Sequence, residues 1–208
     1  MNKKEFSAMD SLKSGWETFL KRPSFLIAVT AVVGVAMMIL NSFSHGNGLM
    51  TLLVVIIGIF VGMGLINFAL KAQKDVKSVQ FADLWYPQAF WSYLGAAILV
   101  GLVVVVGLIL IIIPGIIAIS MFAFVKYIVI DKNMGPIEAM KESLRITEGH
   151  RLEILLLVLM SIVINIIGLL PLMLGLLVTV PVTILAYANA YRILEGVAKK
   201  EHKTESAA

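Results

Sequence analysis

The sequence predicts an all-α, polytopic transmembrane helical bundle, because of its composition and its long apolar runs. Hydrophobic residues make up 60% of the 208 residues and charged residues only 14%, against about 45–50% and about 25% in soluble domains. A chain of this length cannot bury so much apolar surface in its own core, so a bilayer has to supply apolar surroundings. Cysteine is absent, which excludes disulfides and thiolate metal sites.

Apolar runs that approach the length of a spanning helix, about 20 residues, recur along the chain. They are 25–43, 49–70, 92–113, 116–130, 152–168 and 172–191. We expect them to form three hairpins in one transmembrane domain over 25–194. A cytoplasmic amphipathic arm over 1–24 precedes this domain, and a polar cytoplasmic tail over 195–208 follows it.

The run 116–130 is the weakest of these predicted spans. It contains Lys126, and at 1.5 Å per residue it reaches about 22 Å, short of a hydrocarbon core of about 30 Å. Lys126 lies one turn from the end of the run, where a lysine reaches the membrane surface by snorkelling. The sequence leaves open whether 116–130 crosses fully or forms a re-entrant hairpin with 92–113.

The positive charges predict the topology. All 17 lysines and arginines lie on or beside alternate connections: the N-terminal arm, the second-to-third connection, the region around 126–151, and the tail. Cytoplasmic loops of membrane proteins carry this excess of positive charge. We therefore expect a multi-pass protein of the cytoplasmic (inner) membrane with both termini in the cytoplasm. The 24 residues before the first run include Glu5, Asp10 and Glu17, unlike a cleavable signal peptide.

Segments beside the predicted spans are amphipathic or aromatic. One helical stripe is formed by Met9, Leu12, Trp16, Phe19 and Leu20, and a second by Ile137, Met140 and Leu144. An aromatic cluster near 78–91 lies between them, and includes Phe81, Trp85, Tyr86, Phe90, Trp91 and Tyr93. We expect lipid or interfacial contacts at Leu12, Trp16, Trp85, Trp91, Met140 and Leu144.

An internal rhythm connects these segments. Ser11-Leu-Lys-Ser-Gly-Trp16 and Ala139-Met-Lys-Glu-Ser-Leu144 align in character, and each precedes a predicted hairpin. This suggests an interfacial segment followed by a hairpin, three times over, although the middle unit matches poorly.

Polar residues inside the spans allow two interpretations. Asn67, Asn165 and Asn189 either hydrogen-bond between helices or line a small polar cavity. Gly58 and Gly62, with Gly64 close by, favour close packing inside the monomer over dimerisation.

Several prolines and glycines mark expected turns and kinks. Pro114 and Gly115 are expected to form the turn before the fourth run, and Pro171 to lie in the joint between the last two runs. Pro181 is expected to kink the last span.

Catalytic and cofactor motifs are missing from the sequence. It contains no HExxH, P-loop or GxSxG pattern, and no Asp, Glu, His or Arg lies deep in a predicted span. We therefore predict no enzymatic activity, no cofactor and no metal site. The expected partners are membrane lipids, with a membrane protein partner or a homo-oligomer, and no nucleic acid.

Motifs spread along the chain resemble a known family, and the resemblance covers nearly the whole chain. Leu108-Ile-Leu-Ile-Ile-Ile-Pro-Gly-Ile-Ile117 is followed by Phe122-Ala-Phe-Val-Lys-Tyr127 and Glu138-Ala-Met-Lys-Glu-Ser-Leu144, and Ser11-Leu-Lys-Ser-Gly-Trp-Glu-Thr-Phe19 stands near the start. This pattern resembles a family of prokaryotic integral membrane proteins of unknown function and the membrane domain of some glycerophosphoryl diester phosphodiesterases. Those phosphodiesterases carry a catalytic barrel after this domain, and no such barrel precedes Ala208. The resemblance therefore transfers no catalytic residue.

The functional prediction is correspondingly broad. We expect a non-enzymatic membrane module that organises lipid or partner proteins through its amphipathic cytoplasmic segments. The alternative is a small-solute transporter or channel lined by Asn67, Asn165 and Asn189. An intramembrane lipid enzyme is disfavoured, because no nucleophile–base pair is evident.

Overall fold

The computed structural model describes residues 6–44, 47–110, 112–170 and 174–205, and every regular element in those ranges is helical. The elements are α1 (Ala8–Leu20), α2 (Pro23–Phe43), α3 (Gly48–Ala72), η1 (Phe81–Leu84), η2 (Pro87–Ala89), α4 (Phe90–Leu110), α5 (Ile112–Met121), α6 (Val125–Lys132), α7 (Pro136–Thr147), α8 (Arg151–Leu169) and α9 (Leu176–Glu205).

Within the described ranges, five segments are long and apolar enough to cross a membrane. They are Pro23–Phe43, Gly48–Ala72, Phe81–Gly107, Arg151–Leu169 and Leu176–Lys199. The prediction of an all-α, multi-pass membrane protein is confirmed at this level.

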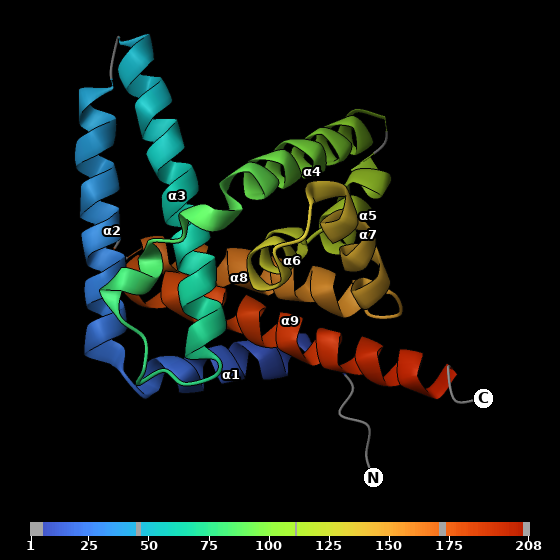
Figure 1. Ribbon diagram of the computed structural model, residues 1–208. Coiled ribbons are helices and arrows are strands. Elements are labelled where there is room, and N and C mark those ends of the chain that lie inside the picture. The colour runs from blue at the N-terminus through green and yellow to red at the C-terminus, as the bar shows by residue number, and fades with distance from the viewer. Residues whose placement is uncertain (1–5, 45–46, 111, 171–173, 206–208) are drawn as a thin grey trace.

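The fourth apolar run does not form one helix. α5 ends at Met121 and α6 begins at Val125, so the ten residues of α5 extend only about 15 Å. α5 packs back along α4, and Figure 1 shows the two lying side by side. The run 116–130 is therefore divided between a short returning helix and a second short helix.

The turn predicted at Pro114 and Gly115 is wrong. α4 ends at Leu110, and both residues lie inside α5, which begins at Ile112. The first N–H groups of a helix have no intrahelical partner, so a proline close to the helix start removes no hydrogen bond. Pro171, the other expected turn residue, lies outside the described residues.

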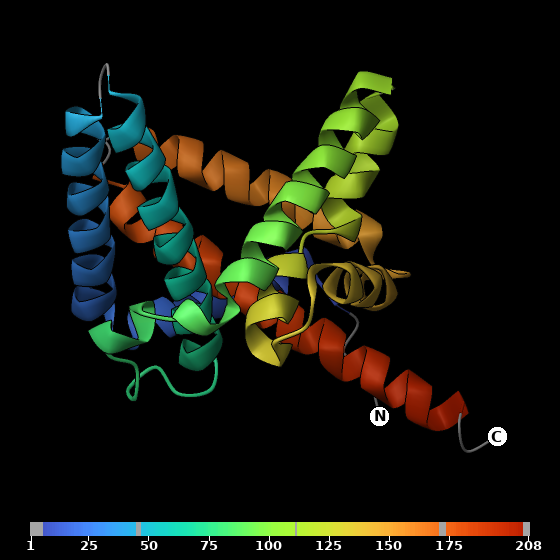
Figure 2. The same ribbon diagram turned by 45° about the horizontal axis from the view of Figure 1, so that its top comes forward.

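The helices pack around a centre formed by α3, α6 and α9. α3 contacts both α6 and α9, and the largest fully buried side chains include Tyr191, Phe124, Met63 and Ile128. The Phe124 ring lies 6.2 Å from the Tyr127 ring and 6.3 Å from the Tyr191 ring, between centroids. In Figure 2, α2 and α3 form an upright pair, while α9 crosses at an angle to them.

Each segment that links two helix pairs packs against a helix of the preceding pair. α1, the first helix of the chain, packs against α9, the last. η1 packs on α3, α7 on α6 and α5, and α1 on α9. A Cβ atom on Gly64 would lie 1.9 Å from the Leu84 carbonyl oxygen, and one on Gly15 2.5 Å from the Val182 carbonyl oxygen. These two contacts therefore require glycine.

α9 continues beyond the predicted end of the transmembrane domain. It runs from Leu176 to Glu205, so the segment 195–205 is helical where a separate tail was predicted. Leu194, Glu195 and Ala198 are buried, and Arg145 of α7 donates a hydrogen bond to the Ala198 carbonyl.

Candidate functional site

α1 has three distinct faces, since successive residues of a helix advance by about 100°. A face of small residues is buried and packs mainly against α9. It consists of Ala8, Ser11, Gly15 and Thr18. About 120° further round is an apolar face with Leu12 and Trp16, and a further 120° round is a polar face with Asp10 and Glu17.

The apolar face of α1 is only half covered by the protein. Leu12 and Phe19 are buried, whereas Met9, Trp16 and Leu20 are 60%, 45% and 54% exposed. The Trp16 and Phe19 rings stack, with 5.6 Å between their centroids. Docking of the small face therefore directs an exposed apolar row, Met9–Trp16–Leu20, away from the rest of the chain.

α7 repeats this arrangement of faces. Its buried residues are Ala139, Ser143, Ile146 and Thr147. Ser143 donates a hydrogen bond to the Met121 carbonyl from 2.8 Å. Apart from Ile146, the inner face again consists of small residues. Ile137 is 62% exposed, and Met140 and Leu144 are half-buried. The described residues thus hold two helices with small inner faces and partly uncovered apolar faces.

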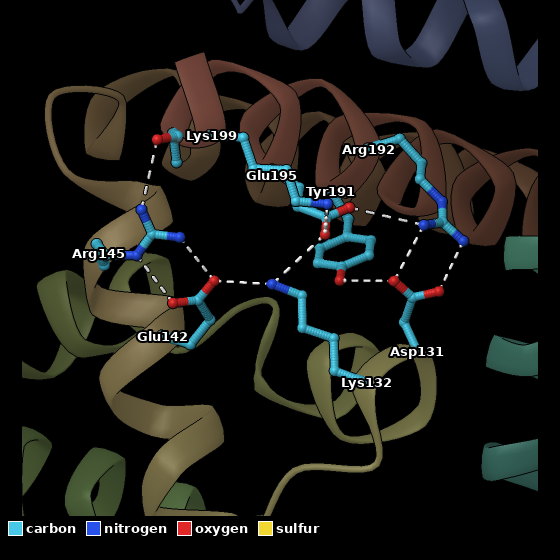
Figure 3. Close-up of polar contacts among 9 residues, drawn as sticks. Asp131, Lys132, Glu142, Arg145, Tyr191, Arg192, Glu195 and Lys199 are labelled. Carbon is cyan, nitrogen blue, oxygen red and sulfur yellow. Dashed lines mark hydrogen bonds and ion pairs between the residues drawn. The ribbon is translucent and has the colours of Figure 1, made fainter. Parts of the chain in front are cut away.

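A carboxylate at the end of α6 connects α6 to α9. Asp131 accepts hydrogen bonds from the Arg192 guanidinium at 3.0 and 2.8 Å and from the Tyr191 hydroxyl at 3.0 Å (Figure 3). The Arg192 Nε atom is buried and has no hydrogen-bond partner in the described part of the chain. Two-nitrogen contact of this kind fixes direction as well as distance.

A second set of charges connects α7 to α9. The Lys132 Nζ atom lies 2.8 Å from Glu142 and 3.4 Å from Glu195, and Lys199 lies 2.8 Å from Glu195. Arg145 donates two hydrogen bonds to Glu142, each 2.8 Å long (Figure 3). We call these residues, with Asp131 and Arg192, the ion-pair layer.

Glu142 is the member of this layer whose protonation the surroundings control most clearly. The hydrogen bonds from Arg145 and the ammonium of Lys132 lower the pKa of Glu142 to about 2, against the opposing effect of burial. The carboxylate therefore stays ionised at neutral pH, which keeps α7 paired with Lys132 of α6.

The structure places the three predicted asparagines in separate surroundings. Asn67 donates to the Asp83 carbonyl at 2.8 Å and so holds η1 on α3. Asn189 donates to Gln73 at 3.4 Å, connecting α9 to the end of α3. Asn165 donates to the Ser161 carbonyl at 2.8 Å within α8. Asn165 lines a cavity whose lining includes neither Asn67 nor Asn189. The structure therefore does not place the three asparagines around one cavity.

The remaining predicted residues differ in exposure. Trp85 and Trp91 are 68% and 80% exposed, and the Trp85 ring stacks on Phe60 at 5.3 Å between centroids. Pro181 lies inside α9, where its missing N–H removes one helical hydrogen bond. Lys126 places its Nζ atom 5.5 Å from the centre of the Tyr93 ring.

The ion-pair layer was missed in the sequence, although part of its signal was there. Arg192, Glu195 and Lys199 follow the i,i+3 and i,i+4 spacing of helical ion pairs. Their pairing with Asp131 and Glu142 depends on how α6 and α7 fold back, which spacing does not reveal.

Comparison with known protein families, with characterised proteins and with solved structures finds no match for this chain. In the residues that the structure describes, no group of three or more His, Asp or Glu side chains is placed to hold a metal ion. The features of the chain that bear on its function are the geometry of α1 and α7 and the ion-pair layer.

Proposed function

We propose that this chain is a non-enzymatic membrane module that holds α1 and α7 in the cytoplasmic interface of the inner membrane, where they bind anionic lipid. The observation that carries this proposal is the exposed row Met9–Trp16–Leu20, on a helix whose opposite side is docked to α9. Amphipathic helices with apolar residues on one face and lysines beside it bind membrane surfaces in this way.

Lysines occupy equivalent places on the two helices. Lys13 follows Leu12, and Lys141 follows Met140, so each lysine lies at the border between the apolar and polar faces. Both are exposed. A lysine at this border keeps its stem along the apolar surface and its ammonium near lipid phosphate.

The proposal includes the finer topology predicted by the charges. Both termini lie in the cytoplasm, and the helix pairs α2–α3, α4–α5 and α8–α9 enter the membrane from that side, with α5 too short to complete a crossing. The resemblance to the phosphodiesterase membrane domain agrees with a module that works beside other activities without one of its own.

Tryptophan fluorescence tests where α1 lies. Trp85→Phe with Trp91→Phe leaves Trp16 as the single tryptophan of a chain that has three. In nanodiscs of brominated phosphatidylglycerol we expect Trp16 to lose about half of its emission or more, because bromine quenches tryptophans that lie in the interface.

The matched control moves the tryptophan by one residue onto the polar face of the same helix. Trp16→Phe with Glu17→Trp, in the same background, should be quenched weakly. Equal quenching at the two positions, or none at Trp16, would contradict interfacial binding.

Lys13→Glu should reduce the preference of liposome binding for phosphatidylglycerol over phosphatidylcholine, and an unchanged preference would argue against anionic lipid.

A further inference from the structure

An open cavity of about 540 Å³ lies between α8 and α9, with Tyr127 of α6 at its border, and the ion-pair layer does not use it. Its volume falls in the range of small-molecule pockets, about 300–1,000 Å³. Most of the lining is apolar, and includes Val158, Ile162, Ile166, Leu176 and Ile184. Ile162 and Ile166 are 50% and 55% exposed, so the cavity opens on the outer side of α8, the side that faces lipid in a membrane.

The two helices meet closely at one end of this cavity. A Cβ atom on Gly175 would lie 2.5 Å from the Gly168 carbonyl oxygen, and one on Gly168 would lie 2.6 Å from the Thr179 hydroxyl. At the other end, Tyr127 of α6 and Tyr187 of α9 line the space. Gly168 and Gly175 thus allow α8 and α9 to approach closely at one end of the cavity, while the tyrosine rings border the open space at the other.

Three polar side chains in the wall, Ser161, Thr183 and Asn165, have used their donors, and Asn165 keeps an acceptor without a partner. Ser161 donates to the Leu157 carbonyl at 2.7 Å, and Thr183 donates to the Val180 carbonyl at 2.9 Å. Both amide hydrogens of Asn165 have partners, at the Ser161 carbonyl and the Thr183 hydroxyl. The Asn165 Oδ1 atom is buried and has no partner among the described residues.

An occupant therefore has to bring a hydrogen-bond donor and an apolar body. A buried acceptor without a partner costs about 1–3 kcal/mol, which a hydroxyl on the ligand would offset. None of the described residues that line the cavity is charged, so a charged headgroup would be desolvated without compensation.

We infer that this cavity binds an uncharged lipid alcohol, such as a monoacylglycerol, with its hydroxyl on Asn165 Oδ1 and its chain along α8. The inference does not depend on how α1 meets the membrane, so the two proposals fail or succeed separately.

Photo-crosslinking tests the site with the full chain in nanodiscs. A monoacylglycerol carrying a diazirine in its chain should label peptides from 158–169 and 176–187 at saturable stoichiometry. 1-Oleoylglycerol should compete about tenfold better than methyl oleate, which has the same chain and no donor, since one buried hydrogen bond supplies about that factor. Labelling spread over all lipid-facing helices, or equal competition by the ester, would overturn the inference.

Two variants with matched controls test the assignment of residues. Ile162→Trp fills the cavity and should reduce labelling about tenfold, whereas Ile98→Trp on α4, where Ile98 is 57% exposed, should leave it unchanged. Asn165→Leu should keep the label but abolish the preference for the alcohol over the ester. If Asn165→Leu keeps that preference, or if phosphatidylglycerol competes as well as 1-oleoylglycerol, the assigned ligand class is wrong.

Discussion

Arg192 holds Asp131 through two nitrogen–oxygen contacts of 3.0 and 2.8 Å, and so ties the last turn of α6 to the middle of α9. Tyr191, the preceding residue on α9, donates to the same carboxylate. Three donors from α9 therefore bind one carboxylate of α6, which fixes the orientation of the two helices as well as their distance. This contact lies at the end of α6, just before the chain turns towards α7.

Asp131→Asn should destabilise the chain by about 1–3 kcal/mol, because the Arg192 guanidinium loses its two short contacts to a charged group and keeps the longer one, 3.6 Å from Glu195. The free energy of unfolding in mixed micelles, followed by circular dichroism during a titration with sodium dodecyl sulfate, measures this loss. Asp10→Asn, at an exposed carboxylate on α1, is the control and should change stability by less than about 0.5 kcal/mol. Equal stability of the two variants would mean that the junction adds nothing.

Acid should weaken the packing of α7 through Glu142. The folded-state pKa of Glu142 is about 2, below its ordinary value of 4.5, so its stabilisation is complete above about pH 4.5 and is lost as the pH falls towards 2. We expect a contribution of about 1–2 kcal/mol, reduced by solvent because Arg145 is 44% exposed. The difference in unfolding free energy between wild type and Glu142→Gln should shrink over this window. Glu138→Gln, at an exposed residue of the same helix, should show no such trend.

Gly64→Ala should lower stability by about 1–3 kcal/mol, because its Cβ atom would overlap the Leu84 carbonyl that η1 presses against α3. Amide hydrogen exchange across 78–84 should accelerate in this variant. Gly34→Ala on α2 has no atom within 4 Å of the new Cβ and should stabilise its helix by about 0.5–1 kcal/mol. Matching losses in both variants would show that the contact with Leu84 is not responsible.

The absence of cysteine makes the proposed topology directly measurable. Single substitutions Ser78→Cys and Glu138→Cys introduce thiols at exposed positions, and Ser44→Cys introduces one at a half-buried position beside the end of α2. A membrane-impermeant maleimide added to intact cells should label Ser44→Cys alone, and the other two variants should react only after the membrane is opened. Labelling of Ser78→Cys or Glu138→Cys in intact cells would overturn the cytoplasmic placement of η1 and α7.

The limits of α2 and α3 were close to prediction because both helices are almost uniformly apolar and have clear end signals. Pro23 begins α2, and the Asn47 side chain caps α3 by accepting from the Leu49 and Met50 N–H groups. The break between α5 and α6 carried no such signal, since the residues around Phe122 are as apolar as the helices beside them.

Hydrophobicity alone does not predict which face of α1 or of α7 is buried against the rest of the protein. The hydrophobic stripe predicted lipid contact at both Leu12 and Trp16, yet Leu12 is buried and Trp16 is 45% exposed. The small residues Ser11 and Gly15 are buried as well. Lipid solvates large apolar side chains as well as a protein core does, so close approach through small residues decides helix packing in membranes. The separate positions of Asn67, Asn165 and Asn189 are a tertiary result that a list of polar residues in spans does not contain.

The length of α9 has a mechanical consequence. It runs unbroken for 30 residues, about 45 Å, and is clamped near its start at Gly175 and again around Arg192. Anything joined close to Glu205 would be mounted on a stiff rod in a fixed orientation to the bilayer, and not on a loose tether.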